Sequence, residues 1–306
     1  MKLPVILFFG STAVGKTDFL LKEFHDRGEV INADSMQVYR YLDIGTSKPD
    51  KKTLEYLPHY LISVVDPDKQ FDSGNFVTAS DKLVRRIIDR GKIPVVSGGT
   101  AFYFKNFLFG LPPVPKIEDS VRKELLDEFR KKGISRIYEK LVKIDPETAK
   151  KISSNDTYRI IRAMEIYNGT GRPLSSFKPP EEIRGKYTFL TIGIRRDRDI
   201  LYRRIDYRVE DMFKKGLIEE IRNLIKMGYK EEDPGMRGIG YKEFFLMAKS
   251  GCLSFPGLKD RIKLNSRHYA KRQMTFFKKL PGVNWYDADD RSKIREKINK
   301  FVDNNF

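Results

Sequence analysis

The glycine loop near the start of the chain constrains the fold more than any other feature. Its residues, Gly10, Ser11, Thr12, Ala13, Val14, Gly15, Lys16 and Thr17, match the pattern G-x-x-x-x-G-K-[ST]. The apolar run Val5–Phe9 before it is too short for a helix and is typical of a buried strand. After it, Asp18–Phe24 carries apolar residues at helical spacing. Because strand, loop and helix follow in this order, the sequence predicts a diphosphate or triphosphate site.

The residue types in this loop suit an anionic ligand. Gly10 and Gly15 allow the backbone to turn tightly, so that several N–H groups point into one cavity. Lys16 adds a positive charge beside the positive end of the following helix dipole. The Thr17 hydroxyl is predicted to bind a Mg²⁺ ion held between phosphates. A plain glycine turn before an ordinary helix, the alternative, would not need all three parts of the pattern.

The composition points to a polyanionic partner. The 306-residue chain carries a net charge of +17, which favours nucleic acid first and an anionic membrane second; a lysine-rich, solvated surface is the alternative. A single cysteine, Cys252, excludes an internal disulfide and a cysteine-based zinc site. No apolar run approaches the ~18 residues of a membrane span. The first strand follows Met1-Lys2 directly, so we expect a cytoplasmic protein without a signal peptide.

The pattern of apolar runs predicts an α/β protein with a helical insertion. Further strands are expected at residues 29–33, 59–66, 93–97 and 187–194, separated by helical segments. This alternation indicates a P-loop NTPase-like, doubly wound parallel sheet. The proline-rich stretch Leu111–Pro115 interrupts the alternation, and only helical periods follow, at 121–129, 134–142 and 158–167. We therefore expect a core of residues 1–112 and 186–306, and an all-helical insertion domain at 113–185.

Candidate site residues follow the predicted second and fourth strands. In open α/β sheets, ligands bind outside the carboxyl ends of the strands, which places Asp34 near the glycine loop. Asp34 could accept a proton, hold a ligand hydroxyl or help to bind Mg²⁺, or it could simply cap a turn. Ser35 and Gln37 carry donors and acceptors that suit a base edge. Thr100, after two glycines, could donate to an anion, whereas we expect Asp66 to be structural.

Two basic segments lie in the C-terminal third of the chain. The glycine-rich loop Arg237–Lys242 carries two cations and a tyrosine. The helix predicted at about 258–279 contains eight cations and one acid, with Arg267, Lys271 and Lys278 near one face. Such a run usually marks a solvated face. Because the matching acids are missing, we expect contacts with a phosphate backbone.

Five motifs, in this order, resemble one family. They are Gly10–Thr17, Ile31–Tyr39 (INADSMQVY), Ser97–Thr100 (SGGT), Arg159–Glu165 (RIIRAME) and Arg237–Glu243 (RGIGYKE). Together they resemble the tRNA dimethylallyltransferases, also called tRNA isopentenyltransferases, over nearly the whole chain. Ser11 stands where the family usually has proline, in the variable part of the loop. The C-terminal zinc finger of the eukaryotic relatives is absent from this sequence.

The resemblance implies a reaction and its partners. A dimethylallyl group would move from dimethylallyl diphosphate to the exocyclic N6 amine of the adenosine just 3′ of a tRNA anticodon, and pyrophosphate would leave. The resemblance implies catalytic roles for Asp34 as general base and for Lys16, Thr100 and Arg208 around the diphosphate, with Mg²⁺ on Thr17. The insertion domain would bind the anticodon stem-loop, and we expect the protein to be a monomer.

The resemblance also implies a set of tRNA contacts. We place them at Asp34, Ser35, Met36, Gln37, Thr100, Arg122, Tyr158, Arg159, Arg162, Arg237, Gly240, Tyr241, Lys242, Arg267, Lys271 and Lys278.

Two other functions remain open from the residues alone. One is a P-loop small-molecule kinase, in which Asp34 holds a substrate hydroxyl and the helical insertion acts as a lid. The other is an RNA-binding ATP switch that leaves its RNA unaltered. The +17 charge and the basic C-terminal helix disfavour the kinase, and the lack of a clear Walker B acid pair disfavours a motor.

Overall fold

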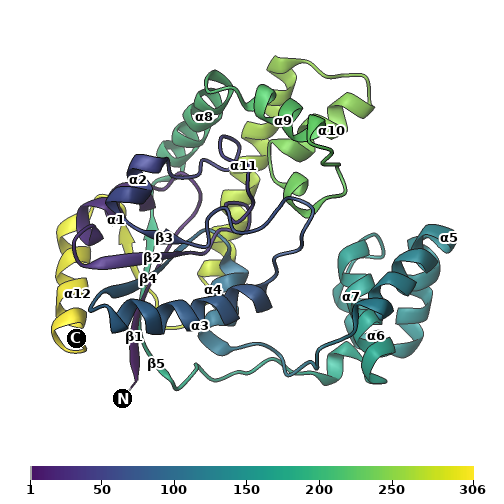
Figure 1. Ribbon diagram of the computed structural model, residues 1–306, viewed down its shortest axis with the longest axis horizontal. Helices are drawn as coiled ribbons and strands as arrows, with labels where there is room; N and C mark the ends of the chain where they lie inside the picture. Colours follow the sequence, from purple (N-terminus) through teal and green to yellow (C-terminus); the bar gives the residue numbers. More distant parts are fainter. Residues whose placement is uncertain (1) are drawn as a thin grey trace. The chain divides into compact units, whose positions relative to one another are not determined.

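A parallel sheet forms the centre of the larger part of the molecule. The computed structural model describes residues 2–306, and within them six parallel strands lie in the order β3-β2-β4-β1-β5-β6 (Figure 1). Their bounds are β1 (Leu3–Phe9), β2 (Gly28–Asn32), β3 (His59–Tyr60), β4 (Ile93–Gly98), β5 (Tyr187–Arg195) and β6 (Asn284–Asp287). The predicted α/β fold with a parallel sheet is therefore confirmed.

The chain divides into two compact units. The core unit consists of the chain up to Leu108 together with Arg184–Phe306, and the helical unit is Phe109–Ile183. The core unit contains the following helices: α1 (Lys16–Phe24), α2 (Lys51–Tyr56), α3 (Ser73–Asp89), α4 (Ala101–Phe109), α8 (Arg198–Lys214), α9 (Leu217–Lys226), α10 (Tyr241–Lys249), α11 (Phe255–Phe277) and α12 (Arg291–Asp303), with the 3₁₀ turn η2 (Pro234–Arg237). The helical unit contains α5 (Asp119–Ile144), α6 (Pro146–Lys151), α7 (Thr157–Thr170) and η1 (Leu174–Ser176).

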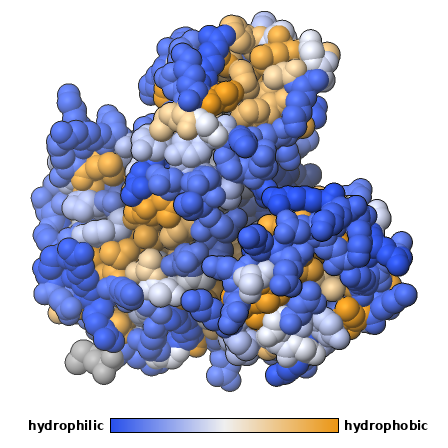
Figure 2. Space-filling view, turned by 45° about the vertical axis from the view of Figure 1, so that its right-hand side comes forward, coloured by the Kyte–Doolittle hydropathy of each residue, from blue (hydrophilic) through white to orange (hydrophobic). Residues whose placement is uncertain are grey.

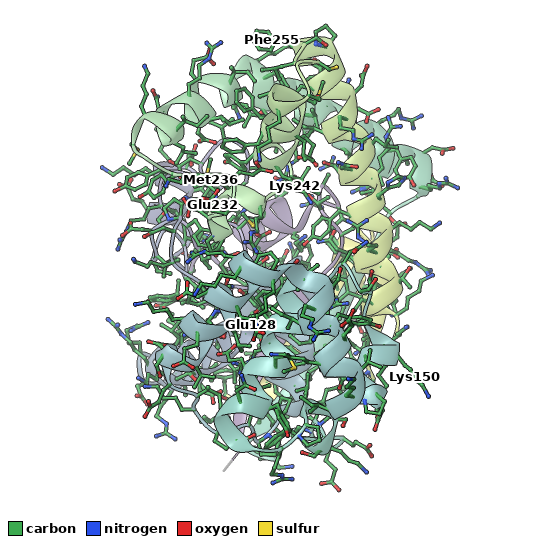
Figure 3. The ribbon with its side chains drawn as sticks, turned by 90° about the vertical axis from the view of Figure 1, so that its right-hand side faces the viewer. Glu128, Lys150, Glu232, Met236, Lys242 and Phe255 are labelled. Atoms are coloured by element: carbon green, nitrogen blue, oxygen red, sulfur yellow. The ribbon has the colours of Figure 1, made fainter. Side chains whose placement is uncertain are left out.

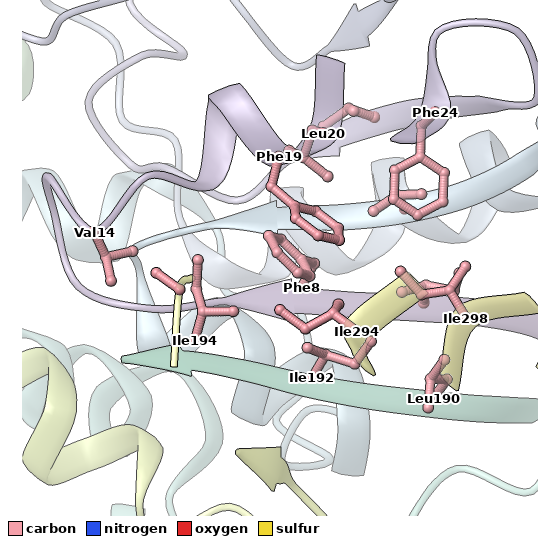
Figure 4. Packing of buried hydrophobic residues seen from close by; sticks show 14 of the residues in the cluster. Phe8, Val14, Phe19, Leu20, Phe24, Leu190, Ile192, Ile194, Ile294 and Ile298 are labelled. Carbon is pink, nitrogen blue, oxygen red and sulfur yellow. The ribbon is translucent and has the colours of Figure 1, made fainter. Parts of the chain in front are cut away.

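Helices cover both faces of the sheet. Alternate side chains of β1 point to opposite faces and therefore pack against different helices. On one face, Phe8 stacks on Phe19 of α1 with ring centroids 4.9 Å apart, and Ile294 and Ile298 of α12 join the same cluster (Figure 4). On the other face, Phe9 stacks on Phe277 of α11 at 4.3 Å.

Two phenylalanines of α4 complete the second face. Phe104 contacts Phe9 and Phe277, and Phe107 contacts Phe76 of α3. Both side chains are fully buried.

The helical unit has an apolar core of its own. Leu125, Ile137 and Leu141 of α5 pack with Ile160 and Met164 of α7, among other buried residues. We predicted two helices in the region that α5 occupies. The prediction is confirmed: α5 consists of two helical segments that are separated at Gly133, whose φ of 75° lies in the left-handed region.

The third predicted strand is wrong over most of its length. We expected residues 59–66, but only His59 and Tyr60 pair with β2. Leu61 and Ser63 have φ angles of 62° and 53°, so the backbone leaves the extended conformation directly after Tyr60. A single bridge between Tyr39 and Val65 follows.

Membrane-spanning helices are not found among residues 2–306. No described helix is both long enough and apolar enough to cross a bilayer.

Candidate active site

A cavity of about 920 Å³ opens at the carboxyl ends of β1, β2 and β4 in the core unit. The predicted site residues that line it include Lys16, Asp34, Gln37 and Arg208, which come from different parts of the sequence. Parallel strands present their carboxyl ends at one edge of the sheet, which explains this convergence. The other walls come from α8, from the loop before α10 and from α11.

The glycine loop forms one side of the cavity. Gly15 has a φ of 110° and Ala13 a φ of 61°, so the chain makes the tight turn that the pattern requires. The Lys16 ammonium donates to the carbonyls of Gly10 at 3.0 Å and Ser11 at 2.9 Å. Loss of hydration lowers the pKa of Lys16 to about 8; the Asp34 carboxylate opposes this shift and the Arg208 guanidinium adds to it.

Long-range side chains hold the loop backbone. Gln273 of α11 accepts from the Thr12 N–H at 2.9 Å and donates to the Gly99 carbonyl at 2.7 Å. Arg204 of α8 donates to the Ala13 carbonyl at 2.7 Å. These bonds fix the backbone of the loop from outside the motif. Neither side chain was among the predicted site residues.

Arg196 makes a similar contact from the end of β5. Its Nε donates to the Val14 carbonyl at 3.3 Å, and its two terminal nitrogens pair with Asp289 at 2.9 and 3.0 Å. The paired Asp289 carboxylate orients the guanidinium toward the loop.

Asp34 caps a turn and lines the cavity at the same time. Its Oδ1 accepts from the Met36 N–H at 2.9 Å and from the Gln37 N–H at 3.3 Å, so the capping turn considered from the sequence is present. No hydrogen bond to Oδ2 occurs among residues 2–306. The charge of Asp34 acts on the pKa values of both Lys16 and Arg208. The carboxylate is thus held rigidly, between two cations, with one oxygen available.

Thr100 lies behind Ser35 rather than in the cavity wall. Its hydroxyl accepts from the Ser35 N–H at 2.9 Å and donates to the Ser35 hydroxyl at 3.1 Å. Tyr269 of α11 does line the cavity, and burial raises the pKa of Tyr269 to about 12. Tyr269 was not among the predicted site residues.

Arg208 and Gln37 share a contact on the loop after Leu42. The Thr46 carbonyl accepts from Arg208 Nη2 and from Gln37 Nε2, each at 3.1 Å. Arg208 Nη1 also donates to the Thr12 hydroxyl at 3.0 Å. Loss of hydration lowers the pKa of Arg208, and the Asp34 carboxylate opposes that shift.

Thr17 lines the cavity at the start of α1. Within residues 2–306, no group of three or more His, Cys, Asp and Glu side chains could hold a metal by itself. A Mg²⁺ ion commonly takes one or two protein oxygens and several phosphate oxygens, so the donor set at Thr17 suits an ion that arrives with a phosphorylated ligand.

The basic face predicted on α11 needs two corrections. We stated that matching acids were missing, but α8 supplies them: Arg267 pairs with Asp206, and Glu210 pairs with Lys259 and Lys263. Arg267 is therefore an ion-pair partner between two helices, not a free cation. Lys271 and Lys278 are exposed and form no ion pair within the described chain.

Tyr241, predicted as a tRNA contact, lies at the cavity with its side chain engaged inside the protein. Tyr241 is fully buried, and its hydroxyl donates to Glu220 at 2.6 Å. Its neighbour Lys242 in α10 is exposed, and Met236 in η2 is buried. Figure 3 labels both residues. Arg237 is exposed and lines the cavity, and Gly240 has a φ of 103°.

In the helical unit, a carboxylate organises two predicted arginines. Glu165 of α7 pairs with Arg122 at 2.9 Å and with Arg162 at 3.0 Å. Arg159 pairs with Asp156, and the Tyr158 side chain is exposed. The arginines remain partly accessible while their positions are restrained.

The comparison with known families decides what kind of protein this is. A model of the family described as "IPP transferase" matches residues 37–280. The chain belongs to the IPP transferase family.

Other IPP transferases resemble the chain over almost its full length. A tRNA dimethylallyltransferase of Alkaliphilus oremlandii is 39% identical over 294 residues, covering 95% of this chain and 93% of that relative. One of Geobacter sulfurreducens is 38% identical over 288 residues, covering 94% and 92%. The resemblance stated from the sequence is confirmed.

Solved structures of similar proteins support the same family. A full-length tRNA isopentenylpyrophosphate transferase of Bacillus halodurans has a TM-score of 0.70 and 34% identity, covering 99% of this chain and 98% of that one. A eukaryotic dimethylallyltransferase, described as acting on tRNA, has a TM-score of 0.80 and 31% identity, covering 99% and 80%.

Proposed function

We propose that this protein transfers a dimethylallyl group from dimethylallyl diphosphate to the exocyclic N6 amine of the adenosine 3′ of a tRNA anticodon, releasing diphosphate. One observation carries the proposal: a single cavity joins a phosphate-binding loop, two cations and a carboxylate with a free oxygen. The membership of the IPP transferase family supports the same chemistry.

The proposed chemistry is a displacement at the first carbon of the prenyl group. The adenosine nitrogen forms a bond to this carbon while the bond from carbon to diphosphate oxygen breaks. Asp34 accepts the proton that the amine loses, through the oxygen that makes no other hydrogen bond. The turn at Met36 and Gln37 holds the carboxylate in place and prevents it from turning away.

The leaving diphosphate gains negative charge as the bond breaks. The loop N–H groups, Lys16 and Arg208 are preorganised to stabilise this charge. Binding of the anion replaces the contacts of Lys16 with loop carbonyls and favours its protonated form, because a nearby negative charge raises a lysine pKa. Mg²⁺, with Thr17 as one ligand, would add positive charge at the same place.

Gln37, Ser35 and Met36 form the wall proposed for the adenine. The Gln37 amide nitrogen is engaged by the carbonyls of Thr46 and Ser47, which fixes its orientation. Its oxygen is then the group left to accept from a base edge. An anticodon-loop base is not locked in a duplex, so moving it into a cavity costs only a few kcal/mol.

We place the anticodon stem-loop on the helical unit and on exposed cations of the core. The contacts proposed are Arg122, Tyr158, Arg159, Arg162, Arg237, Lys242, Lys271 and Lys278. Arg122 and Arg162 suit this role because Glu165 restrains them without burying them. We expect the protein to act as a monomer in the cytoplasm.

A transfer assay tests the function directly. The purified protein is incubated with Mg²⁺, radiolabelled dimethylallyl diphosphate and unmodified tRNA with adenosine 3′ of the anticodon, and label in the RNA is counted. A parallel reaction contains labelled ATP. We expect label in RNA only with the prenyl donor. Absence of transfer, together with phosphate moved or released from ATP, would refute the proposal in favour of a kinase.

A further inference from the structure

A glutamate outside the cavity holds the loop that both Arg208 and Gln37 contact. The Oε2 atom of Glu220, on α9, accepts from the backbone N–H groups of Asp43 at 2.8 Å and Ile44 at 2.7 Å. Its Oε1 accepts from the Gly45 N–H at 3.0 Å. Three successive N–H groups pointing at one carboxylate form a concave anion-binding arrangement of backbone, which ties the loop to α9.

A buried hydroxyl completes the arrangement. Tyr241 donates to Oε1 of Glu220 at 2.6 Å, so the carboxylate accepts four hydrogen bonds in all. Burial raises the pKa of Tyr241 well above its usual value, with the Glu220 charge as the next cause, so the phenol remains a donor. A Cβ atom on Gly45 would lie 2.5 Å from the Tyr241 ring, which shows how closely the loop approaches this side chain.

The held loop is the common support of two groups in the cavity. The Thr46 carbonyl, directly after Gly45, accepts from Arg208 and Gln37, and the Ser47 carbonyl accepts from Gln37 at 3.3 Å. The Thr46 hydroxyl donates back to the Leu42 carbonyl at 2.6 Å, closing the loop on itself. The loop contains no helix or strand between Leu42 and Lys48, so hydrogen bonds must fix its position.

We propose that Glu220 is a positioning residue for the transfer reaction: by holding the backbone of residues 43–45, it sets the Thr46 carbonyl that orients Arg208 toward the diphosphate and Gln37 toward the adenosine. The ligands assigned to Arg208 and Gln37 rest on the proposed function. The hydrogen bonds that orient these two side chains are observed independently of that function.

The test compares variants of Glu220 with a neighbouring control. Glu220→Gln keeps the size but replaces one acceptor oxygen with a donor, which cannot face a backbone N–H. Glu220→Asp keeps the charge on a side chain that is shorter by one methylene group. Glu219→Gln changes an exposed acid on the same helix and is the matched control. All proteins are first checked for folding by circular dichroism and thermal unfolding.

We expect Glu220→Gln to reduce kcat/KM about a hundredfold, because a displacement of about 1 Å in a site can cost that much. KM for dimethylallyl diphosphate should rise, inorganic diphosphate should bind at least about tenfold more weakly by calorimetry, and Glu220→Asp should fall between Glu220→Gln and the wild type. Glu219→Gln should match the wild type. Folded Glu220 variants with unchanged kcat/KM and diphosphate affinity would overturn the proposal.

A rescue experiment separates positioning from general instability. Glu220→Ala leaves a space beside three N–H groups, and formate can occupy it as a small carboxylate. We expect added formate to restore activity to Glu220→Ala several-fold and to leave Glu220→Gln unchanged, since the amide fills the space. Equal responses of the two variants would overturn the proposal.

The calorimetric measurement distinguishes a failure of the Glu220 proposal from a failure of the proposed function, because it does not depend on transfer activity. If the wild type transfers no prenyl group, the proposed function fails. The diphosphate affinity of the Glu220 variants, compared with that of the wild type, still decides whether Glu220 positions Arg208.

Discussion

Asp34 joins two roles that the sequence left as alternatives. One oxygen caps the turn that carries Met36 and Gln37, and the other stays available at the cavity. The two roles support each other, because a base must be held in one orientation to receive a proton efficiently.

The first prediction concerns this carboxylate. Asp34→Asn keeps an oxygen for the turn but removes the base, so kcat should fall about a hundredfold or more while tRNA affinity changes by a few-fold at most. Single-turnover transfer and filter-binding measurements check this. Asp66→Asn, which alters an ion pair with Arg40, is the control and should retain activity. A fully active Asp34→Asn would end the general-base assignment.

The second prediction concerns stability. A Cβ atom on Gly98 would lie 2.2 Å from the Ala33 carbonyl oxygen, at the point where β2 and β4 meet the cavity. Because backbone must move, Gly98→Ala should lower the free energy of unfolding by about 2–3 kcal/mol. Gly185→Ala meets no atom within 4 Å and should change it by less than about 0.5 kcal/mol. Urea unfolding of both variants measures the difference, and equal stabilities would contradict the packing argument.

Site residues that belong to a local sequence pattern were predicted far better than side chains that reach the site from distant parts of the sequence. The phosphate loop and Asp34 could be found because each follows a short apolar strand, Gln37 lies on the turn after Asp34, and parallel topology brings strand ends together. Gln273 and Glu220 reach their partners over more than 170 residues of chain, and no local pattern marks a side chain that binds a distant backbone. The burial of Tyr241 could not be predicted, because a motif position does not reveal burial.

At the scale of elements, α8 and α11 form a charged pair. The acids missing from α11 in the sequence are present on α8, where Asp206 and Glu210 face three cations of α11. Helix ends were predicted to within a few residues: α11 spans Phe255–Phe277, against an expected 258–279. The strand predicted at residues 59–66 is shorter in the structure because Leu61 and Ser63 adopt left-handed backbone conformations. Such conformations cannot be recognised in an apolar run that contains no glycine.

The third prediction follows from this pair. Hydrogen bonds from Lys259 and Lys263 lower the pKa of Glu210 to about 2, from a usual value near 4.5. Because the folded pKa is the lower one, the stabilisation is present above pH 4.5 and is lost as pH falls toward 2. The stability difference between wild type and Glu210→Gln should therefore shrink between pH 5 and pH 3. Urea titrations at several pH values measure it, with exposed Glu296→Gln as the control. A constant difference would refute the linkage.

At the scale of the whole molecule, the excess of +17 charges remains after internal pairing. Hydrophilic residues cover most of the face that Figure 2 shows. Positive charge that finds no internal acid, as at Lys271 and Lys278, is free to replace counterions along a polynucleotide.

The fourth prediction measures this surface. If Lys271 contacts a tRNA phosphate, Lys271→Ala should weaken binding and reduce the slope of log K against log salt by about one unit. Lys300→Ala removes an exposed lysine from α12 and should leave the slope unchanged. Fluorescence titrations at several salt concentrations give the slopes. An unchanged slope for Lys271→Ala would place this lysine on a solvated face.

The order of strands has a consequence for synthesis on the ribosome. β1 lies inside the sheet and pairs with β5 from Leu3 to Phe9, yet β5 is made only after the whole helical unit. At ordinary rates of translation, one edge of β1 waits on the order of ten seconds for its partner. The helical unit, with its own core, is complete before that edge is covered. The nascent core therefore exposes an apolar strand edge throughout this interval, and this interval is where a chaperone would be needed.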